Sequence, residues 1–321
     1  THECFFLLAN LHAYTTRADH PNEIRSDTLE IVRDYLAMGI DPSKSAITLQ
    51  SEVPAILELT FLFAMLLPFN RVMRNPTLKE EIKVKGLGDN YCFGFPLYAV
   101  GQTADILAFR AHSVPVGEDQ VPHIELTREV ARRFNKLYCG IDENVEDDAP
   151  EMIEKGVFPI PKADVGKVGR LVGTDGVNKM SKSLNNTILI TDSPKQVKKK
   201  LGQLYTGRQS MTDPGDPDSS LMQYVETFIE TSRAAEIKDL YVRGDNIGDG
   251  HIKVEIADSI SELLAPMQER RAIYEGDDDS IIDIIKDGTA MANAKTEETL
   301  TMAKEAAGLR FFDREILLKG T

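Results

Sequence analysis

The chain has little cysteine, and its cysteines are poorly placed for covalent or metal chemistry. Its 321 residues include three, Cys4, Cys92 and Cys139, which are far apart and form no CxxC pair. An odd number at this spacing argues against a disulfide framework and against a structural zinc site. We therefore expect three buried, reduced thiols, as in a protein of a reducing compartment.

Long hydrophobic runs are also missing. The longest apolar stretch, residues 57–69, is interrupted by Glu58, Thr60 and Pro68 and is shorter than the ~20 residues that cross a membrane. We predict that it forms a buried helix. The first residues show no signal-peptide pattern. The sequence therefore predicts a cytoplasmic protein without a membrane partner.

Positive charge is in deficit. Lys and Arg number 37 against 51 Asp and Glu, which gives a formal net charge of -14. So acidic a chain is not a general nucleic-acid coat, and we expect no DNA partner. Residues 195–200 hold four lysines and are a candidate RNA contact, with a solvated helix face as the alternative interpretation. We find no internal repeat and no low-complexity tract.

The first part of the chain alternates between strand and helix patterns. Residues 4–9 are a continuous apolar run, typical of a strand buried on both faces of a parallel sheet. Helical spacing over residues 22–38 ends at Gly39, and residues 46–50 form a second strand. Ser51 is predicted to cap the next helix, with Pro54 in its first turn. This order predicts an α/β fold with a doubly wound parallel sheet.

The later part of the chain is mostly helical in pattern. Residues 187–190 resemble a short strand, and no convincing strand follows Ile190. We expect a helix capped by Asp192 or Ser193, and further helices around 221–229, 256–267, from 281 and over 290–307. Residues 70–90 are predicted to be a loop or a mobile helical excursion, and the acidic residues 142–155 a surface loop. The predicted domains are residues 1–191 (α/β) and residues 192–321 (α-helical).

A candidate ligand site lies where one predicted strand ends. Residues 114–116 form this strand, Gly117 follows, and a helix begins at His123. In open α/β sheets ligands bind beyond the carboxyl ends of strands, and the first amides of a helix favour negative charge. Gly117 lets a ligand approach the backbone, and Asp119 can accept hydrogen bonds from ribose hydroxyls. The helix, which we expect to end at Gly140, is predicted to have one apolar face: Leu126, Val130, Phe134 and Leu137.

A second candidate site is the loop from residue 173 to residue 186. Its glycines and Asn-Lys turn allow tight bending. Two ammonium groups, Lys179 and Lys182, are interleaved with Ser181 and Ser183. Lysine is a compact charge on a flexible stem, which suits a polyanion that is gripped for one step and then released. A solvated surface loop is the alternative.

Several motifs in this order resemble a known family. The string Lys-Met-Ser-Lys-Ser at 179–183 matches the KMSKS signature of class I aminoacyl-tRNA synthetases. Before it come Ala-Asp-Ile-Leu at 104–107, Val-Pro-Val-Gly-Glu-Asp-Gln at 114–120 and His-Ile-Glu-Leu-Thr at 123–127. Together with Leu-Ala-Asn-Leu-His at 8–12, this order resembles the tryptophanyl-tRNA synthetase family.

The resemblance implies a Rossmann-like catalytic domain followed by a helical anticodon-binding domain. It implies that L-tryptophan is activated with ATP to tryptophanyl-adenylate and transferred to tRNA(Trp). Mg²⁺ would accompany ATP, held mostly by phosphates and water, and the protein would be a homodimer.

The resemblance also implies roles for single residues. Lys179 and Lys182 would stabilise the charge on the departing pyrophosphate. The family's ATP-binding positions correspond to Gly117, Glu118, Asp119, Leu171, Lys179, Met180, Ser181, Lys182 and Ser183. Its tryptophan-binding positions correspond to Asp105, Gln120, His12 and Tyr98, with Asp105 as the acceptor for the indole N–H.

Two alternatives stay open at this point. The family's HIGH-like segment does not occur in the chain, so we expect either that it precedes Thr1 in a longer protein or that the chain is an inactive, tRNA-binding paralogue. The related tyrosyl-tRNA synthetases share the lysine loop and an Asp-Gln pair. They are less similar around residues 117–123.

Overall fold

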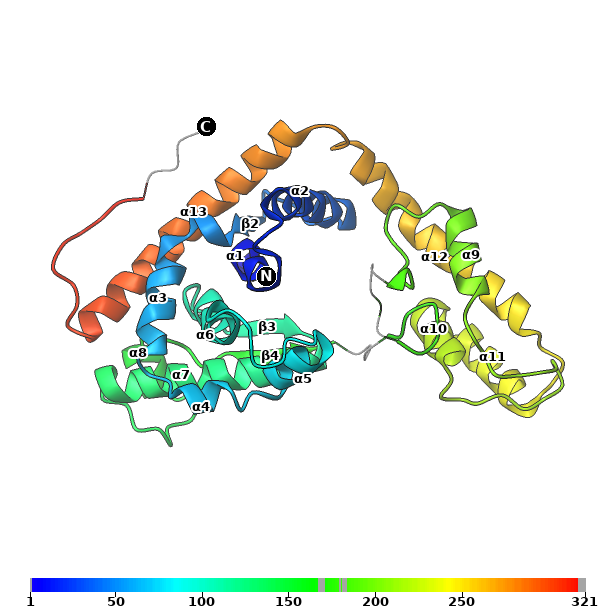
Figure 1. Cartoon of the computed structure of the whole chain (residues 1–321), viewed down its shortest axis with the longest axis horizontal. Coiled ribbons are helices and arrows are strands. Elements are labelled where there is room, and N and C mark those ends of the chain that lie inside the picture. Colours follow the sequence, from blue (N-terminus) through cyan, green and yellow to red (C-terminus); the bar gives the residue numbers. More distant parts are fainter. Residues whose placement is uncertain (1, 167–170, 179, 181–183, 317–321) are drawn as a thin grey trace. The chain divides into compact units, whose positions relative to one another are not determined.

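The computed structural model describes residues 2–166, 171–178, 180 and 184–316 (Figure 1). The chain forms two compact units. Unit 1 consists of Thr1–Arg33, Ile40–Gly166 and Gly276–Thr321, and unit 2 of Asp34–Gly39 and Lys167–Glu275. Among the described residues, no helix is long and apolar enough to cross a membrane.

The first strand pair of unit 1 is parallel, as predicted. Strand β1 (Cys4–Leu8) pairs with β2 (Ser45–Leu49), in a register that places Leu8 opposite Leu49. Helices α1 (Asn10–Arg17) and α2 (Pro21–Met38) connect the two strands, and Gly39 ends α2 with a φ of +97°. The prediction that the first strand is buried on both faces is wrong, because Leu8 is its one buried residue and Cys4 is exposed.

The second strand pair is also parallel. Strand β3 (Ser113–Val116) pairs with β4 (Lys162–Val165), and η2 (Glu118–Gln120), α7 (Val121–Cys139) and α8 (Pro150–Lys155) connect them. Gly140 ends α7 in the left-handed conformation, as expected. Leu126, Val130 and Phe134 are buried on one face, but Leu137 is 55% exposed and is not part of it.

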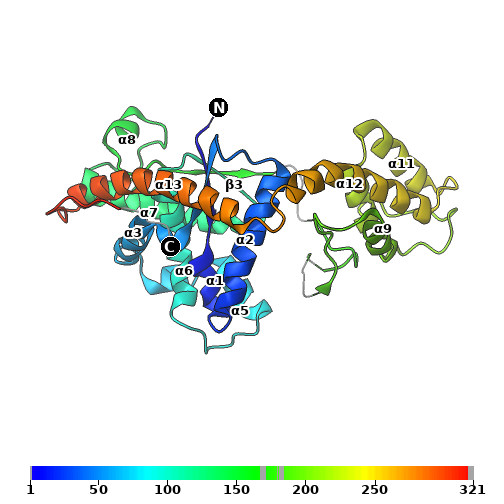
Figure 2. The same cartoon turned by 90° about the horizontal axis from the view of Figure 1, so that it is seen from above.

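The core of unit 1 forms between helices that cover these strands. Phe63 of α3 (Pro54–Ala64), Phe134 of α7 and Phe158 make edge-to-face contacts, with centroids 4.8 to 6.5 Å apart. Helix α6 (Gly94–Leu107) packs against both α3 and α7. Helix α13 (Asp278–Ala306) packs on β2 and on α3 (Figure 1); Figure 2 shows it from above.

Three sequence predictions in this region are wrong in whole or in part. Val53, not Ser51, is the N-cap of α3, because Ser51 lies in the short helix η1 (Gln50–Glu52). The run 57–69 is helical up to Ala64 but is buried on one face alone, because Leu59 and Phe63 are 0% exposed whereas Phe61, Met65 and Phe69 are at least 60% exposed. The thiols of Cys4 and Cys92 are exposed and that of Cys139 is half-buried, although all three are free.

The polar segment 70–90 contains two short helices. They are α4 (Phe69–Val72) and α5 (Pro76–Val84), and Asn75 caps α5 by accepting the backbone N–H of Thr77. The structure therefore favours the helical alternative for this segment over the loop.

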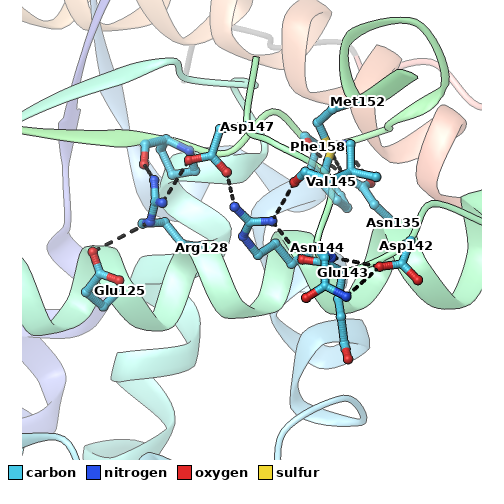
Figure 3. Close-up of polar contacts among 12 residues, drawn as sticks. Glu125, Arg128, Asn135, Asp142, Glu143, Asn144, Val145, Asp147, Met152 and Phe158 are labelled. Carbon is cyan, nitrogen blue, oxygen red and sulfur yellow. Dashed lines mark hydrogen bonds and ion pairs between the residues drawn. The ribbon is translucent and has the colours of Figure 1, made fainter. Parts of the chain in front are cut away.

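The acidic segment from residue 142 is tied to α7 by arginines (Figure 3). Arg128 Nη2 donates to Asp147 Oδ2 at 2.8 Å, and Arg132 forms an ion pair with the same carboxylate. Further along α7, buried Asn135 donates to the carbonyl of Phe158 at 2.7 Å and accepts its N–H at 3.2 Å. Asp147, and Glu143 through its ion pair with Lys136, therefore offset part of the positive charge of α7.

Unit 2 is helical in its described parts. Its helices are α9 (Pro194–Gly202), α10 (Ser220–Phe228), α11 (Thr231–Arg243) and α12 (Asp249–Ala272). Ser193 caps α9 in a reciprocal bond pair with Gln196, which confirms one of the two predicted caps. Residues 187–190 form no strand, contrary to the prediction. They lie along the unit's core, which Leu201, Tyr224 and other apolar side chains form.

The last helix is longer than predicted. The patterns from 281 and over 290–307 belong to the single helix α13, which Asp277 caps. As expected, no strand follows Ile190 up to residue 316. Since α13 belongs to unit 1, the compact units and the predicted domains have different limits.

Candidate active site

Asp105 is a nearly buried carboxylate on α6. Its side chain is 9% exposed, and Gln50 Nε2 donates to its Oδ1 at 2.7 Å. Burial raises the pKa of Asp105 from 3.8 to about 7, while the bond from Gln50 acts in the opposite direction. The carboxylate can therefore gain from a further hydrogen-bond donor that replaces water.

His12, on α1, completes a cluster with Asp105 and Gln50. Its Nδ1 lies 3.6 Å from Asp105 Oδ2, and its Nε2 lies 3.2 Å from Gln50 Nε2. Burial, and then the nearby His123, lower the pKa of His12 from 6.5 to about 4, so the ring is neutral at neutral pH. The Gln50 amide nitrogen can only donate, so this network assigns the ring proton to Nδ1, the nitrogen that faces Asp105.

Gly101 and Tyr98 lie one and two turns before Asp105, respectively, on the same face of α6. A β-carbon on Gly101 would be 2.6 Å from His12 Nε2, so glycine lets the histidine lie against the helix. The Tyr98 hydroxyl donates to Glu81 Oε2 at 2.9 Å, and the Tyr98 ring centroid lies 5.9 Å from that of His12. Burial, and then Glu81, raise the pKa of Tyr98 above its ordinary value.

The segment after β3 also contacts α6, through a hydrogen bond between Gln102 and Gln120. Gln102 Nε2 donates to Gln120 Oε1 at 3.1 Å, and Gln120 Nε2 donates to Asp119 Oδ2 at 3.1 Å. The Asp119 carbonyl accepts from Thr77 Oγ1 at 2.7 Å. Gly117, Glu118 and Asp119 are exposed, so their backbone is open to a ligand.

The predicted residues of unit 1 are thus brought together. His12 lies beside both Asp105 and Tyr98, and Gln120 is bonded to Gln102, the residue of α6 that follows Gly101. Sequence reasoning missed Gln50 and Glu81, which bond to Asp105 and Tyr98. A usable signal for Gln50 was its place directly after β2, since ligand sites in such sheets form at strand ends.

The remaining predicted residues are in unit 2. Leu171 and Met180 are half-buried and pack against the core of that unit. Lys179, Ser181, Lys182 and Ser183 lie outside the described residues, so their predicted roles are not addressed by the geometry.

The described base of the lysine loop is well ordered by Asp175. Its carboxylate accepts the backbone N–H groups of Val177 and Asn178 at 3.0 Å and the side-chain amide of Asn186 at 2.9 Å. The side-chain hydrogen bond from Asn178 has the largest effect, and together with the backbone bond from Val177 it holds the pKa of Asp175 well below its usual range. Gly176 has a φ of +74°, as the predicted tight turn requires.

Metal ligation by the protein finds no support in the described parts of the two units. No group of three or more His, Cys, Asp or Glu residues there could hold a metal ion.

Comparisons with known proteins agree on one family. A family model described as tRNA synthetases class I (W and Y) matches residues 1–265. The tryptophan–tRNA ligase of Clostridium longisporum is 39% identical over 313 residues, covering 96% of this chain and 88% of that protein. That of Treponema pallidum is 39% identical over 314 residues, with the same two shares.

A solved structure extends the likeness to three dimensions. The tryptophanyl-tRNA synthetase of Campylobacter jejuni, in complex with ADP and tryptophan, has a TM-score of 0.75 and 29% identity. The match covers 96% of this chain and 90% of that one. It confirms the predicted class I, Rossmann-like fold with a helical C-terminal region. The chain belongs to the class I tRNA synthetases of the tryptophan and tyrosine (W and Y) family.

Proposed function

We propose that the protein activates L-tryptophan with ATP to tryptophanyl-adenylate and transfers the aminoacyl group to tRNA(Trp). The observation that carries this proposal is the nearly buried Asp105 carboxylate, which sits beside Gln50 and neutral His12 at the strand ends. The indole N–H is a donor only and needs such an acceptor. The relatives compared above are named for tryptophan.

The proposed amino-acid pocket uses the residues gathered on α1, α6 and η2. Asp105 accepts the indole N–H, and the Tyr98 ring forms a wall. His12 and Gln120 orient the amino acid. Glu81 fixes the Tyr98 hydroxyl, so the wall cannot turn easily.

The proposed ATP-binding residues occur in two segments of the chain. Gly117 and the two acids after it receive the adenosine side of ATP, and Leu171 contacts the adenine through its backbone. The loop residues 179–183 hold the phosphates, with Lys179 and Lys182 as the catalytic cations. Mg²⁺ enters with the phosphates and is held mostly by them and by water, so we assign it no protein ligand.

The anticodon-binding region, predicted for residues 192–321, is proposed to lie in α9 to α12. These helices belong to unit 2, whereas α13 belongs to unit 1. Lys195 and Lys199, both on α9, are candidates for phosphate contacts, with a solvated face as the alternative. We also propose a cytoplasmic location, which would keep the two exposed thiols reduced.

An amino-acid panel tests the proposed activity. Pyrophosphate exchange with tryptophan, tyrosine and phenylalanine should show strong preference for tryptophan, followed by charging of tRNA(Trp). Preference for tyrosine would make the protein a tyrosyl enzyme. Binding of tRNA with no exchange for any amino acid would instead support the inactive paralogue.

Gly101→Ala should weaken tryptophan use without weakening the fold. The new β-carbon pushes the His12 ring out of place, and such misplacement costs about 10- to 100-fold in kcat/KM. Alanine in a helix interior is more stable than glycine by about 0.5–1 kcal/mol, which offsets part of the cost of displacing the His12 ring, so Tm should change little. The matched control is Gly94→Ala at the start of α6, where the nearest atom is 3.8 Å away. Equal kcat/KM values for the two variants would show that His12 has no role in tryptophan use.

The proposed homodimer is supported by an apolar stripe on unit 1. Leu57 and Phe61 of α3 and Met65, the C-cap residue of this helix, recur every four residues and are 48%, 69% and 64% exposed. They therefore lie on one helix face, and a contiguous exposed apolar face marks an interaction site.

Phe61→Glu should convert the dimer to a monomer, because it buries a charge in the proposed interface. Light scattering during size-exclusion chromatography measures the mass. Ile273→Glu, at a position 70% exposed in unit 2, is the control and should stay dimeric. A Phe61→Glu protein that keeps the wild-type dimer mass would rule out α3 as the interface.

A further inference from the structure

Gln50 directs every polar atom of its side chain at the candidate amino-acid site. Its Nε2 donates to Asp105 Oδ1 at 2.7 Å and lies 3.2 Å from His12 Nε2. Its Oε1 accepts the backbone N–H of His12 at 3.4 Å. The residue is 1% exposed, so water cannot replace these hydrogen bonds if they are lost.

Among side chains of this size, an amide alone can donate to both the Asp105 carboxylate and the His12 ring and also accept the backbone N–H of His12. The amide supplies two hydrogens on one nitrogen, one for the carboxylate and one for the ring, and an oxygen for the backbone. A glutamate would put a second carboxylate beside Asp105, and a leucine would leave Asp105 with no amide donor. The amide nitrogen also fixes the His12 tautomer that points Nδ1–H at Asp105.

The short helix that carries Gln50 is held on one side by α1. Asn10 Nδ2 donates to Ser51 Oγ at 2.9 Å, and the Ser51 N–H donates to Asn10 Oδ1 at 3.0 Å. This reciprocal pair joins η1 to the start of the helix that carries His12.

On the other side η1 is held by α13, more than two hundred residues later in the chain. The backbone N–H of Leu49 donates to Thr289 Oγ1 at 3.1 Å, and Asn293 Nδ2 donates to the Glu52 carbonyl at 2.9 Å. These bonds bracket Gln50 on both sides in sequence. Thr289 and Asn293 are buried at 1% and 4% exposure, so loss of either bond would leave a buried polar group without this partner.

The approach of α13 is close enough to need a glycine. A β-carbon on Gly288 would lie 2.2 Å from the carbonyl oxygen of Ile47, in β2. Main chain therefore lies against main chain here, and α13 sets the position of the end of β2 directly.

We propose that Gln50 is a positioning residue for the amino-acid substrate, which orients Asp105 and His12, and that α13 fixes Gln50 through Thr289 and Asn293. This inference rests on the proposed function, in which Asp105 accepts the indole N–H. In this proposal α13 influences substrate choice indirectly, because it fixes Gln50 and does not itself contact the substrate.

Positioning by Gln50 has a consequence for pH dependence. The groups that face the Asp105 carboxylate among the described residues are Gln50 from η1 and His12 from α1. His12 has a pKa of about 4 and stays neutral above pH 6. Tryptophan use should therefore rise with pH as Asp105 ionises near pH 7. The hydrogen bond from Gln50 lowers the pKa of Asp105. Loss of this bond should therefore raise the pKa and move the increase in tryptophan use to higher pH.

Gln50→Leu tests the first half of the proposal in the full protein. Tryptophan kcat/KM in pyrophosphate exchange should fall about 10- to 100-fold, because a hydrogen bond to a charged group is lost. The KM for ATP should hardly change, the preference over phenylalanine should narrow, and the pH midpoint should rise. A folded variant with the wild-type preference and the wild-type pH profile would overturn the role of Gln50.

Thr289→Val tests the second half and remains informative if Gln50→Leu does not fold. Valine keeps the shape but cannot accept the Leu49 N–H, so tryptophan kcat/KM should fall about three- to tenfold with the same change in preference. The control is Thr299→Val, also buried in α13, where the hydroxyl bonds to Lys295 of its own helix. Equal values for the two variants would overturn the role of α13.

Failure of the proposed function and failure of the positioning role give different experimental results. A wild-type protein that prefers another amino acid, or none, contradicts the proposed function. A wild-type protein that prefers tryptophan, with unaltered Gln50→Leu and Thr289→Val variants, contradicts only the positioning role.

Discussion

Lys182→Ala should slow formation of tryptophanyl-adenylate by about 100-fold or more, and Lys179→Ala should do the same. When the tryptophan carboxylate attacks the α-phosphorus, negative charge builds on the departing pyrophosphate. A cation placed there beforehand stabilises the transition state more than the ground state, so kcat falls when it is removed. Tryptophan binding measured without ATP should hardly change.

The described base of the loop supports the same expectation. Asp175 gathers the amides of Val177, Asn178 and Asn186, and the Thr174 N–H donates to the Asn186 carbonyl at 2.8 Å. The two described ends of the loop are thus held close together. A β-carbon on Gly173 would lie 2.2 Å from Asn186 Nδ2, which shows how closely the two ends pack.

Pyrophosphate exchange and single-turnover adenylate formation measure the effect of the lysines. Lys44→Ala is the control, since Lys44 is exposed in a loop of unit 1 and pairs with Asp41. Wild-type exchange rates in both Lys179→Ala and Lys182→Ala would show that the two lysines have no catalytic role.

Local signals in the sequence were enough to predict much of the fold. Alternating strand and helix patterns located β1, α2, β2 and β3, and cap signals located the ends of α2, α7 and α9. These features depend on neighbouring residues alone, so a single sequence reveals them. The family motifs then identified Asp105, which no local pattern distinguishes from a surface aspartate.

Features that depend on long-range contacts could not be predicted. The return of α13 to β2 joins Thr289 to Leu49, and periodicity carries no information about which element a helix packs on. The exposure of Phe61 and Met65 is a similar case, because an apolar helix face looks the same in a core and in an interface. Gln50 was missed for the same reason, because its hydrogen-bond partners lie on α1 and α6, which are distant from it in the sequence.

Asp105→Ala should nearly abolish the preference for tryptophan over phenylalanine. Both side chains are large and flat, so shape alone discriminates weakly. With tryptophan bound, the carboxylate accepts the indole N–H. With phenylalanine bound, it loses water and gains no partner, a cost of a few kcal/mol, or roughly 10² to 10⁵ in kcat/KM.

Folding of the Asp105 variants can be judged separately from substrate choice. The pKa of Asp105 is about 7 in the folded protein and 3.8 ordinarily. The stability that the protonated group contributes is therefore fully present below about pH 4 and is lost as the pH rises through about 7. At pH 8 the ionised, nearly buried carboxylate opposes folding, so Asp105→Asn should be at least as stable as the wild type in denaturant titrations.

The graded pair of variants completes the specificity prediction. Asp105→Asn should weaken tryptophan use, because its amide oxygen still accepts the indole N–H but without charge, whereas Asp105→Ala should weaken it further. Tyrosine is the harder competitor, since its hydroxyl can also donate to the carboxylate, and there the longer indole outline must decide. The measurement is kcat/KM for adenylation of all three amino acids by each variant. If Asp105→Ala keeps the wild-type preference for tryptophan over phenylalanine, Asp105 does not determine specificity, and the choice is made by the walls of the pocket instead.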